Sequence, residues 1–277
     1  MTLDTHEVVR EETCGQSVVR RVSAMLDIDP TSVLAGGTLP RGWQFVLLGA
    51  DTRRSELRSD GFGGFGVRMP DLGLPRLLLG SRSVHYAHDV PIGANVRRVS
   101  RLVSQSEKST ASGPMAVVTI AHEIWLSTSD APAITEEQTY LLLGESPGAP
   151  PSADGSKEFE IPESSYISVV VPDDTLLFQY SALGFNSHRI HLDRTYAREV
   201  EGFPDLVVNG GLSTLLLTEF LRRDIGVTPN RVDLRYSAPL FAQRPITLTG
   251  DERDDHYELR ALDDTGRVAV GMKAFVR

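Results

Sequence analysis

A polar stretch in the second half of the chain contains side chains that can move protons. Residues 180–193 include His188 and His191, with Asn186 before them and Asp193 after them. An imidazole gains and loses a proton near neutral pH, so a loop with two histidines could supply a catalytic acid or base. The stretch therefore indicates a site. Polarity alone agrees equally well with a surface loop whose histidines only form structural hydrogen bonds.

An apolar segment that begins with glycines follows this stretch. Asn209, Gly210 and Gly211 precede apolar side chains at helical spacing, which are Leu212, Leu215, Leu216 and Phe220. The spacing predicts a helix that is buried along one side and ends near residue 223. A polar, histidine-rich loop that leads into a glycine-led helix is the part of the chain where we expect the chemistry.

The elements around these two segments indicate an α+β fold. In the second half we expect a short strand at 176–180 and four more at 231–238, 245–251, 256–262 and 267–276. In the first half we expect a helix at 16–26 and strands at 82–88, 95–107, 115–126 and 139–143. Residues 84–99 and 234–249 share a pattern of strand, bend and strand, which suggests an internal repeat. One helix followed by antiparallel strands, twice, is typical of an α+β architecture.

A linker separates the two halves. Residues 145–157 are rich in proline, glycine and serine, a composition that neither packs a core nor holds a helix. We therefore predict two domains, at residues 1–148 and 158–277.

Composition excludes several classes of function. The 277 residues carry a formal net charge of −9, which repels phosphate backbones and argues against a nucleic-acid partner. The one cysteine, Cys14, rules out a disulfide within the chain and suits a reducing compartment. Residues 1–12 lack the apolar run of a secretory signal, and no apolar stretch approaches the roughly 18 residues of a membrane span. We expect a cytoplasmic protein with no membrane partner.

The polar stretch resembles the hydratase motif of the MaoC-like, (R)-specific enoyl-CoA hydratase superfamily. It is most similar to the branch of mesaconyl-C4-CoA and itaconyl-CoA hydratases, because residues 180–193 and 196–204 follow that branch closely. Residues 39–43, 69–70, 121–124 and 134–138 resemble the landmarks of its N-terminal half. The resemblance implies a double hot-dog fold, in which two antiparallel sheets each wrap a central helix.

The resemblance also implies roles for individual residues. His191 aligns with the motif histidine and would act as the catalytic acid or base. Asn186 stands where the superfamily usually has an aspartate, so it could orient water but could not take a proton. His188 would hold the loop or share the proton transfer. The N–H groups of Gly210 and Gly211, at the positive end of the helix, would donate to the thioester oxygen.

Four further residues are expected to contact the substrate. They are Tyr180, Arg189, Asn209 and Trp43, the last of which fits a plain core position equally well. Asn209 departs from the branch, which usually has histidine there. Phe62 and Phe65 lie among glycines and could form either a flap over the acyl group or an ordinary loop.

The function implied is that of a hydro-lyase. It would add water reversibly to itaconyl-CoA or mesaconyl-C4-CoA and give citramalyl-CoA, as in itaconate degradation. Two alternatives stay open: a hydratase or dehydratase for another 3-hydroxyacyl-CoA or carrier-protein thioester, and a non-catalytic acyl-CoA binder. No metal is expected, and no cofactor beyond the CoA that the substrate carries. The N-terminal half would be a non-catalytic pocket wall, and a homodimer is left open.

Overall fold

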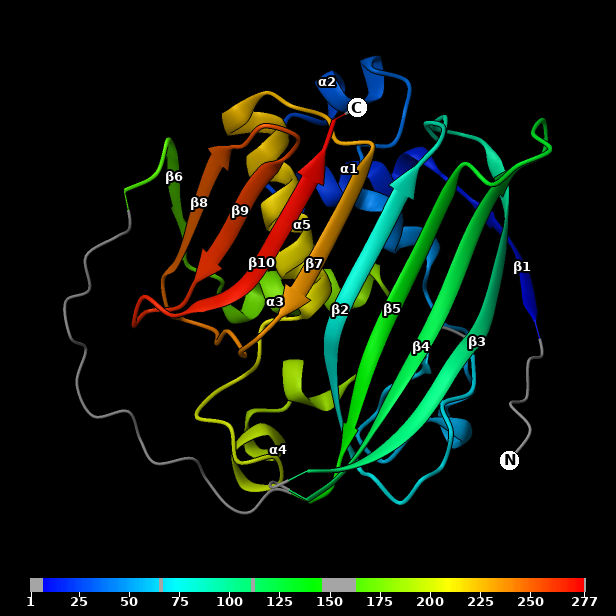
Figure 1. The fold of residues 1–277 in the computed structure, drawn as a ribbon. Coiled ribbons are helices and arrows are strands. Elements are labelled where there is room, and N and C mark those ends of the chain that lie inside the picture. The colour runs from blue at the N-terminus through cyan, green and yellow to red at the C-terminus, as the bar shows by residue number, and fades with distance from the viewer. Residues whose placement is uncertain (1–6, 65–66, 111–112, 146–162, 277) are drawn as a thin grey trace.

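The computed structural model describes residues 7–64, 67–110, 113–145 and 163–276. Its centre is a ten-stranded antiparallel sheet in the order β1-β3-β4-β5-β2-β7-β10-β9-β8-β6 (Figure 1). The strands are β1 (Val8–Thr13), β2 (Arg76–Tyr86), β3 (Asn95–Thr110), β4 (Gly113–Leu126), β5 (Ile134–Leu143), β6 (Tyr166–Val170), β7 (Arg231–Tyr236), β8 (Ile246–Glu252), β9 (Tyr257–Leu262) and β10 (Val268–Phe275).

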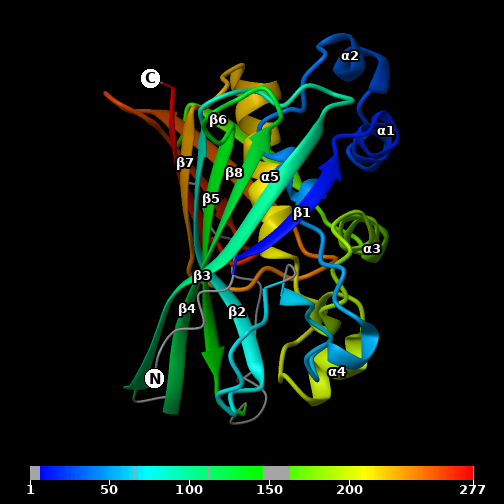
Figure 2. The ribbon, with the colours of Figure 1, turned by 90° about the vertical axis from the view of Figure 1, so that its right-hand side faces the viewer.

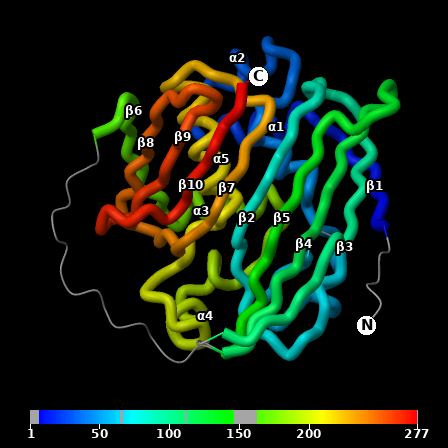
Figure 3. The backbone as a smooth tube through the Cα atoms, viewed as in Figure 1, coloured from blue at the N-terminus to red at the C-terminus, as the bar shows by residue number. Residues whose placement is uncertain are grey.

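The sheet consists of two halves with mirrored strand order. Strands β1 to β5 form one half and β6 to β10 the other, and each strand of the first half corresponds to the strand five places later. The halves meet where β2 and β7 run side by side, with Arg82 opposite Leu234 (Figure 3). This order agrees with the repeat predicted from the apolar pattern. The predicted boundaries at 148 and 158, and most of the linker, lie outside the described residues.

The expected strands are present except for one. Residues 176–180 belong to helix α3 (Asp174–Leu183), so the strand prediction there was wrong. The side chain of Asp173 accepts a hydrogen bond from the backbone N–H of Leu176 at 2.7 Å and so caps the start of the helix. A short apolar run is consistent with either a strand or a buried helix, and the capping hydrogen bond of Asp173 favours the helix here. The outermost strands, β1 and β6, were not predicted.

The helices lie on one face of the sheet (Figure 2). They are α1 (Gln16–Met25), α2 (Pro30–Ala35), α3, α4 (Arg194–Glu199) and α5 (Gly210–Phe220), and α5 continues as a π-helical turn, Leu221–Ile225. Helix α5 runs along the sheet and buries Leu212, Leu215 and Leu217 completely. None of the helices in the described ranges has the length and apolar character needed to cross a membrane.

The two halves of the sheet differ in the helices that cover them. The two sheets are joined into one, and among the described residues only the second half has a helix in the position of α5. In the first half, the described residues before β2 form α1, which packs against α2 and α3, and two short 3-10 turns, Trp43–Leu47 and Arg54–Glu56. This segment is rich in glycine and proline, which disfavour a long helix.

Candidate active site

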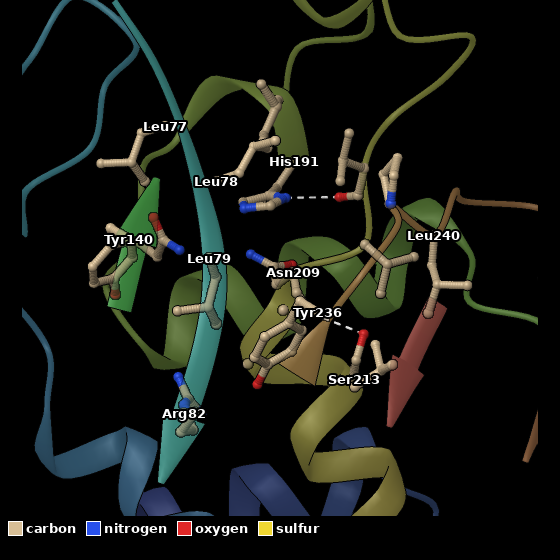
Figure 4. Close-up of a pocket in the computed structure, with 18 of the residues that line it drawn as sticks. Leu77, Leu78, Leu79, Arg82, Tyr140, His191, Asn209, Ser213, Tyr236 and Leu240 are labelled. Atoms are coloured by element: carbon tan, nitrogen blue, oxygen red, sulfur yellow. Dashed lines mark hydrogen bonds between the residues drawn. The ribbon is translucent and has the colours of Figure 1, made fainter. Parts of the chain in front are cut away.

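A cavity of about 220 Å³ lies between the two halves of the molecule. Strands β2 and β5 of the first half form one wall, and α3, the polar stretch, the start of α5 and β7 form the other (Figure 4). Most of its lining is apolar, with Leu77, Leu78, Leu79 and Leu240 among the side chains. Polar side chains reach the cavity from both walls.

His191 lines the cavity as a neutral imidazole. It ends a 3-10 turn, Arg189–His191, and its Nδ1 lies 2.7 Å from the carbonyl oxygen of Val207. A carbonyl can only accept, so Nδ1 carries the proton and Nε2 keeps a free lone pair. Burial, reinforced by the neighbouring His188, lowers the pKa of His191 to about 3, and the bond to Val207 opposes this. The ring is therefore a base at neutral pH.

His188 packs against His191 and is not among the residues that line the cavity. The two rings meet edge to face with centroids 5.2 Å apart, and Phe62 packs against His188 at 5.8 Å. Its Nε2 is 3.9 Å from the Asp60 carboxylate. Burial and the charge of Arg58 lower the pKa of His188 to about 3, so it too is neutral. Its position favours holding the loop over sharing the proton transfer.

A loop of the first half forms hydrogen bonds that hold the polar stretch in position. The backbone N–H of Arg189 donates to the carbonyl oxygen of Asp60 at 2.8 Å, and the hydroxyl of Ser187 donates to that of Gly61 at 2.7 Å. Gly61 has a φ of +82°, and a Cβ there would overlap the Ser187 carbonyl. The fully buried Asp60 carboxylate accepts from Arg58 and from the N–H of Phe62. The sequence predicted only a glycine-rich loop here, because these contacts join residues more than a hundred positions apart.

Asn186 lines the cavity at its loop side. Its Oδ1 accepts a hydrogen bond from the backbone N–H of His188 at 3.1 Å, which forms a local turn in front of His191. An amide has no titratable proton in the physiological range, so Asn186 can orient a water molecule but not ionise it.

The start of α5 presents backbone donors to the cavity. Gly210 and Gly211 both line it, and the first helical hydrogen bond runs only from Ser213 N to Asn209 O, at 3.0 Å. The N–H groups of the first turn have no partner within the helix, and the Asn209 side chain does not cap them. A Cβ on Gly211 would overlap the hydroxyl of Tyr180, so this position requires glycine.

Asn209 is buried and faces the cavity with one unsatisfied atom. Its Nδ2 donates to Ser181 Oγ at 3.2 Å, whereas its Oδ1 has no hydrogen-bond partner among the described residues. The predicted position of Asn209 and Tyr180 at the substrate pocket agrees with this lining.

Two of the residues expected at the substrate lie elsewhere, and we correct them here. Arg189 points away from the cavity, where it pairs with Asp193 at 2.8 Å and stacks over the ring of Tyr196. Trp43 is fully buried in the core, and its Nε1 donates to Glu219 at 2.7 Å. Phe62 does line the cavity, whereas Phe65 lies outside the described residues.

The deep end of the cavity contains five polar residues, of which sequence analysis identified only Tyr180. Arg82, Gln138, Tyr140, Tyr180 and Tyr236 all line it, and we call this set the polar floor. A signal for it exists in the sequence: Glu136, Gln138 and Tyr140 alternate along one strand, which places three polar side chains on the same face of the sheet. Within the described ranges, no three His, Cys, Asp or Glu side chains come together as metal ligands.

Comparison with known proteins matches this chain to one family. The family model for "hydroxyacyl-thioester dehydratase type 2" matches residues 42–242. The chain is also 33% identical over 266 residues to the mesaconyl-C(4)-CoA hydratase of Chloroflexus aurantiacus, covering 95% of this chain and 92% of that protein.

Solved structures support the same fold. HtdX of Mycobacterium tuberculosis superposes with a TM-score of 0.69 at 16% identity and covers 100% of both chains. A second Mycobacterium tuberculosis protein, described as having a double hot-dog fold, has a TM-score of 0.57 at 11% identity and covers 99% of this chain and 95% of its own. The predicted α+β, double hot-dog class is confirmed.

Proposed function

Because the chain belongs to the hydroxyacyl-thioester dehydratase type 2 family, we propose that it is an acyl-CoA hydratase that adds water reversibly to an enoyl thioester. The observation that carries the proposal is the pairing of one neutral base with one set of backbone donors. His191 and the first turn of α5 border the same cavity, which is otherwise mostly apolar.

The chemistry needs a base, an acid and donors for a growing negative charge. Nε2 of His191 takes a proton from water as the water oxygen bonds to Cβ, and the electron pair of the double bond shifts onto the thioester oxygen. The N–H groups of Gly210 and Gly211 stabilise that enolate. The imidazolium then returns a proton to Cα, so that one water has been added. The reverse sequence removes water.

A single imidazole carries both proton transfers in this scheme. Asn186 cannot titrate, and His188 is covered by Phe62 and His191. Asn186 orients the water, and His188 holds the ring of His191. No cofactor is required other than the CoA of the substrate.

We further propose that the substrate is mesaconyl-C4-CoA, with citramalyl-CoA as the product; itaconyl-CoA, whose double bond is not conjugated with the thioester, would enter this scheme only after isomerisation to mesaconyl-C4-CoA. The similarity over nearly the whole chain to a mesaconyl-C(4)-CoA hydratase supports this choice. The competing candidate is another hydroxyacyl thioester, as the family description allows. A cytoplasmic location and a homodimer stay predictions from the sequence.

One assay separates these possibilities. The purified protein is incubated with mesaconyl-C4-CoA, and the enoyl absorbance and free thiol are followed together. A hydratase lowers the absorbance and releases no thiol. Thiol release would indicate a thioesterase, and binding without either change would indicate a non-catalytic acyl-CoA binder. Crotonyl-CoA, assayed in parallel, reports whether a simpler acyl group is preferred.

A further inference from the structure

An arginine is buried at the deep end of the cavity, and a strand irregularity places it there. The register of β2 against β5 shifts between Leu79 and Ser81, so one extra residue is inserted at Gly80. Such a bulge reverses the alternation of the strand. Leu77, Leu78 and Leu79 line the cavity before the bulge and Arg82 lines it after the bulge, with only 6% of its side chain exposed.

The guanidinium of Arg82 keeps hydrogen-bonding capacity. Its Nε lies 3.2 Å from Oε1 of Glu136 but makes no hydrogen bond of good geometry in the described structure. Its Nη1 reaches Thr214 Oγ1 only at a long 3.4 Å, and the Tyr180 hydroxyl is a further partner of the guanidinium. A guanidinium has five N–H donors, and these contacts leave part of them for a ligand.

The charge of Glu136 is already well compensated. Besides its ion pair with Arg82, the Glu136 carboxylate accepts hydrogen bonds from Nε2 of Gln44 at 2.9 Å and from Nε2 of Gln138 at 2.5 Å. Both amide groups donate to the carboxylate and so share its negative charge. They reduce its repulsion of a second anion on the cavity side of Arg82.

Tyrosine hydroxyls complete the polar floor. Burial raises the pKa of Tyr180 and that of Tyr236, so both phenols stay protonated. The Tyr236 hydroxyl lies 2.5 Å from Thr214 Oγ1, and that of Tyr180 sits over Gly211 at the start of α5. The floor thus combines a cation with neutral hydroxyls beside the positive end of a helix.

We propose that the polar floor binds a carboxylate carried by the acyl group, with Arg82 as the residue that selects it. A purely hydrocarbon acyl group would leave the remaining N–H donors of the buried Arg82 without a partner, whereas a carboxylate accepts from several of them at once. Figure 4 shows His191 at one end of the cavity and Arg82 at the other, with Asn209, Leu79 and Tyr236 between them. This inference rests on the proposed function and adds the side chain that decides the substrate class.

The test uses two substrates of the same shape. Mesaconyl-C4-CoA and 3-methylcrotonyl-CoA differ by a carboxylate in place of a methyl group on Cβ. We expect the wild-type protein to prefer the carboxylate, and Arg82→Gln to lower kcat/KM for mesaconyl-C4-CoA by about 10²-fold. The value for 3-methylcrotonyl-CoA should change less than about threefold. Equal losses on both substrates would overturn the proposal.

Two variants guard against a trivial loss of folding. Arg82→Gln leaves Glu136 buried without its cation, so the double variant Arg82→Gln/Glu136→Gln is measured beside it and should show the same loss of preference. Arg98→Gln is the matched control, because Arg98 is also fully buried but bonds to the carbonyls of Leu47 and Gly49, outside the cavity lining. It should lower stability and leave the ratio of the two kcat/KM values unchanged.

A binding experiment keeps this inference separate from the proposed function. Methylsuccinyl-CoA and isovaleryl-CoA are the saturated counterparts of the two substrates and cannot be hydrated. Calorimetry should show tighter binding of methylsuccinyl-CoA to wild type, with the difference lost in the double variant. If wild type hydrates neither enoyl-CoA, the proposed function fails, and this binding difference still decides the role of Arg82. The role of Arg82 would be refuted if wild type bound the two saturated thioesters equally, or if the double variant still bound methylsuccinyl-CoA more tightly.

Discussion

At the scale of single residues, the state of His191 is set by two neighbours. The Val207 carbonyl fixes the proton on Nδ1, and burial with His188 nearby keeps the ring neutral. An imidazole outside such surroundings would be about half protonated at pH 6.5, and only its neutral fraction could accept a proton from water.

Removal of this imidazole should abolish turnover. For His191→Ala we expect kcat to fall by about 10²- to 10⁴-fold, the range found when one acid or base group is lost. Calorimetric binding of methylsuccinyl-CoA and the thermal midpoint check that the pocket and fold persist. The control is His85→Ala, which removes an exposed imidazole from β2. Near-normal turnover by a folded His191→Ala protein would sink the assignment.

The pH profile of kcat/KM should not show the fall near pH 6.5 that protonation of an ordinary histidine causes. The pKa of His191 is lowered from 6.5 to about 3, so the neutral form that the proposed mechanism requires persists as the pH falls through the ordinary imidazole range. We expect kcat/KM for mesaconyl-C4-CoA to stay level between about pH 8 and pH 5, and to fall only at lower pH as His191 gains a proton. Initial rates in a series of buffers, with enzyme stability checked at each pH, measure this. A limb near pH 6.5 would show that the imidazole is solvated.

At the scale of elements, the start of α5 depends on close packing against α3. The Tyr180 ring stacks on Phe45 with centroids 4.5 Å apart, and its hydroxyl lies over the Cα of Gly211. This contact aligns the first N–H groups of the helix with the cavity.

A methyl group on Gly211 should disturb the alignment of these N–H groups with the cavity. For Gly211→Ala we expect kcat to fall by about 10²-fold, because a displaced donor no longer faces the thioester oxygen. The overlap with Tyr180 should also cost about 1–3 kcal/mol of unfolding free energy. Gly271→Ala is the matched control, since a Cβ there meets no atom within 4 Å. Comparable activity in the two variants would contradict the role given to this end of α5.

At the scale of the whole molecule, the two halves contribute different parts of one cavity. The first half supplies Phe62, Arg82 and Tyr140, and the second supplies His191 and the start of α5. The first half has no counterpart of α5 in its described residues, so the repeat of the sheet is not matched by a repeat of the site.

This asymmetry predicts one active site per chain. Titration with methylsuccinyl-CoA should give one equivalent bound per chain, because the only helix start that faces the described cavity belongs to the second half. The activity of His188→Ala/His191→Ala serves as an independent check and should be negligible. Two equivalents, or substantial activity of the double variant, would mean that the first half holds a site of its own.

Local patterns in the sequence determined much of this protein. Strand alternation, helical spacing and the internal repeat predicted the antiparallel strands, α1 and α5, because these patterns follow from which face of each element is buried. The resemblance of residues 180–193 to a hydratase motif placed His191 and Asn186 at a site, and the structure sets both at the cavity. The glycines before α5 likewise marked a helix start.

Tertiary structure alone decided which side chains share the cavity. The bulge at Gly80 turns Arg82 inward, whereas Arg189 turns outward to Asp193 and Trp43 fills the core. The support of the polar stretch by Asp60 and Gly61 also comes from the opposite half. Such contacts join residues distant in the chain, and no local periodicity encodes them. They depend on how two sheet halves pack, so only the folded chain determines the chemistry of the deep end of the site.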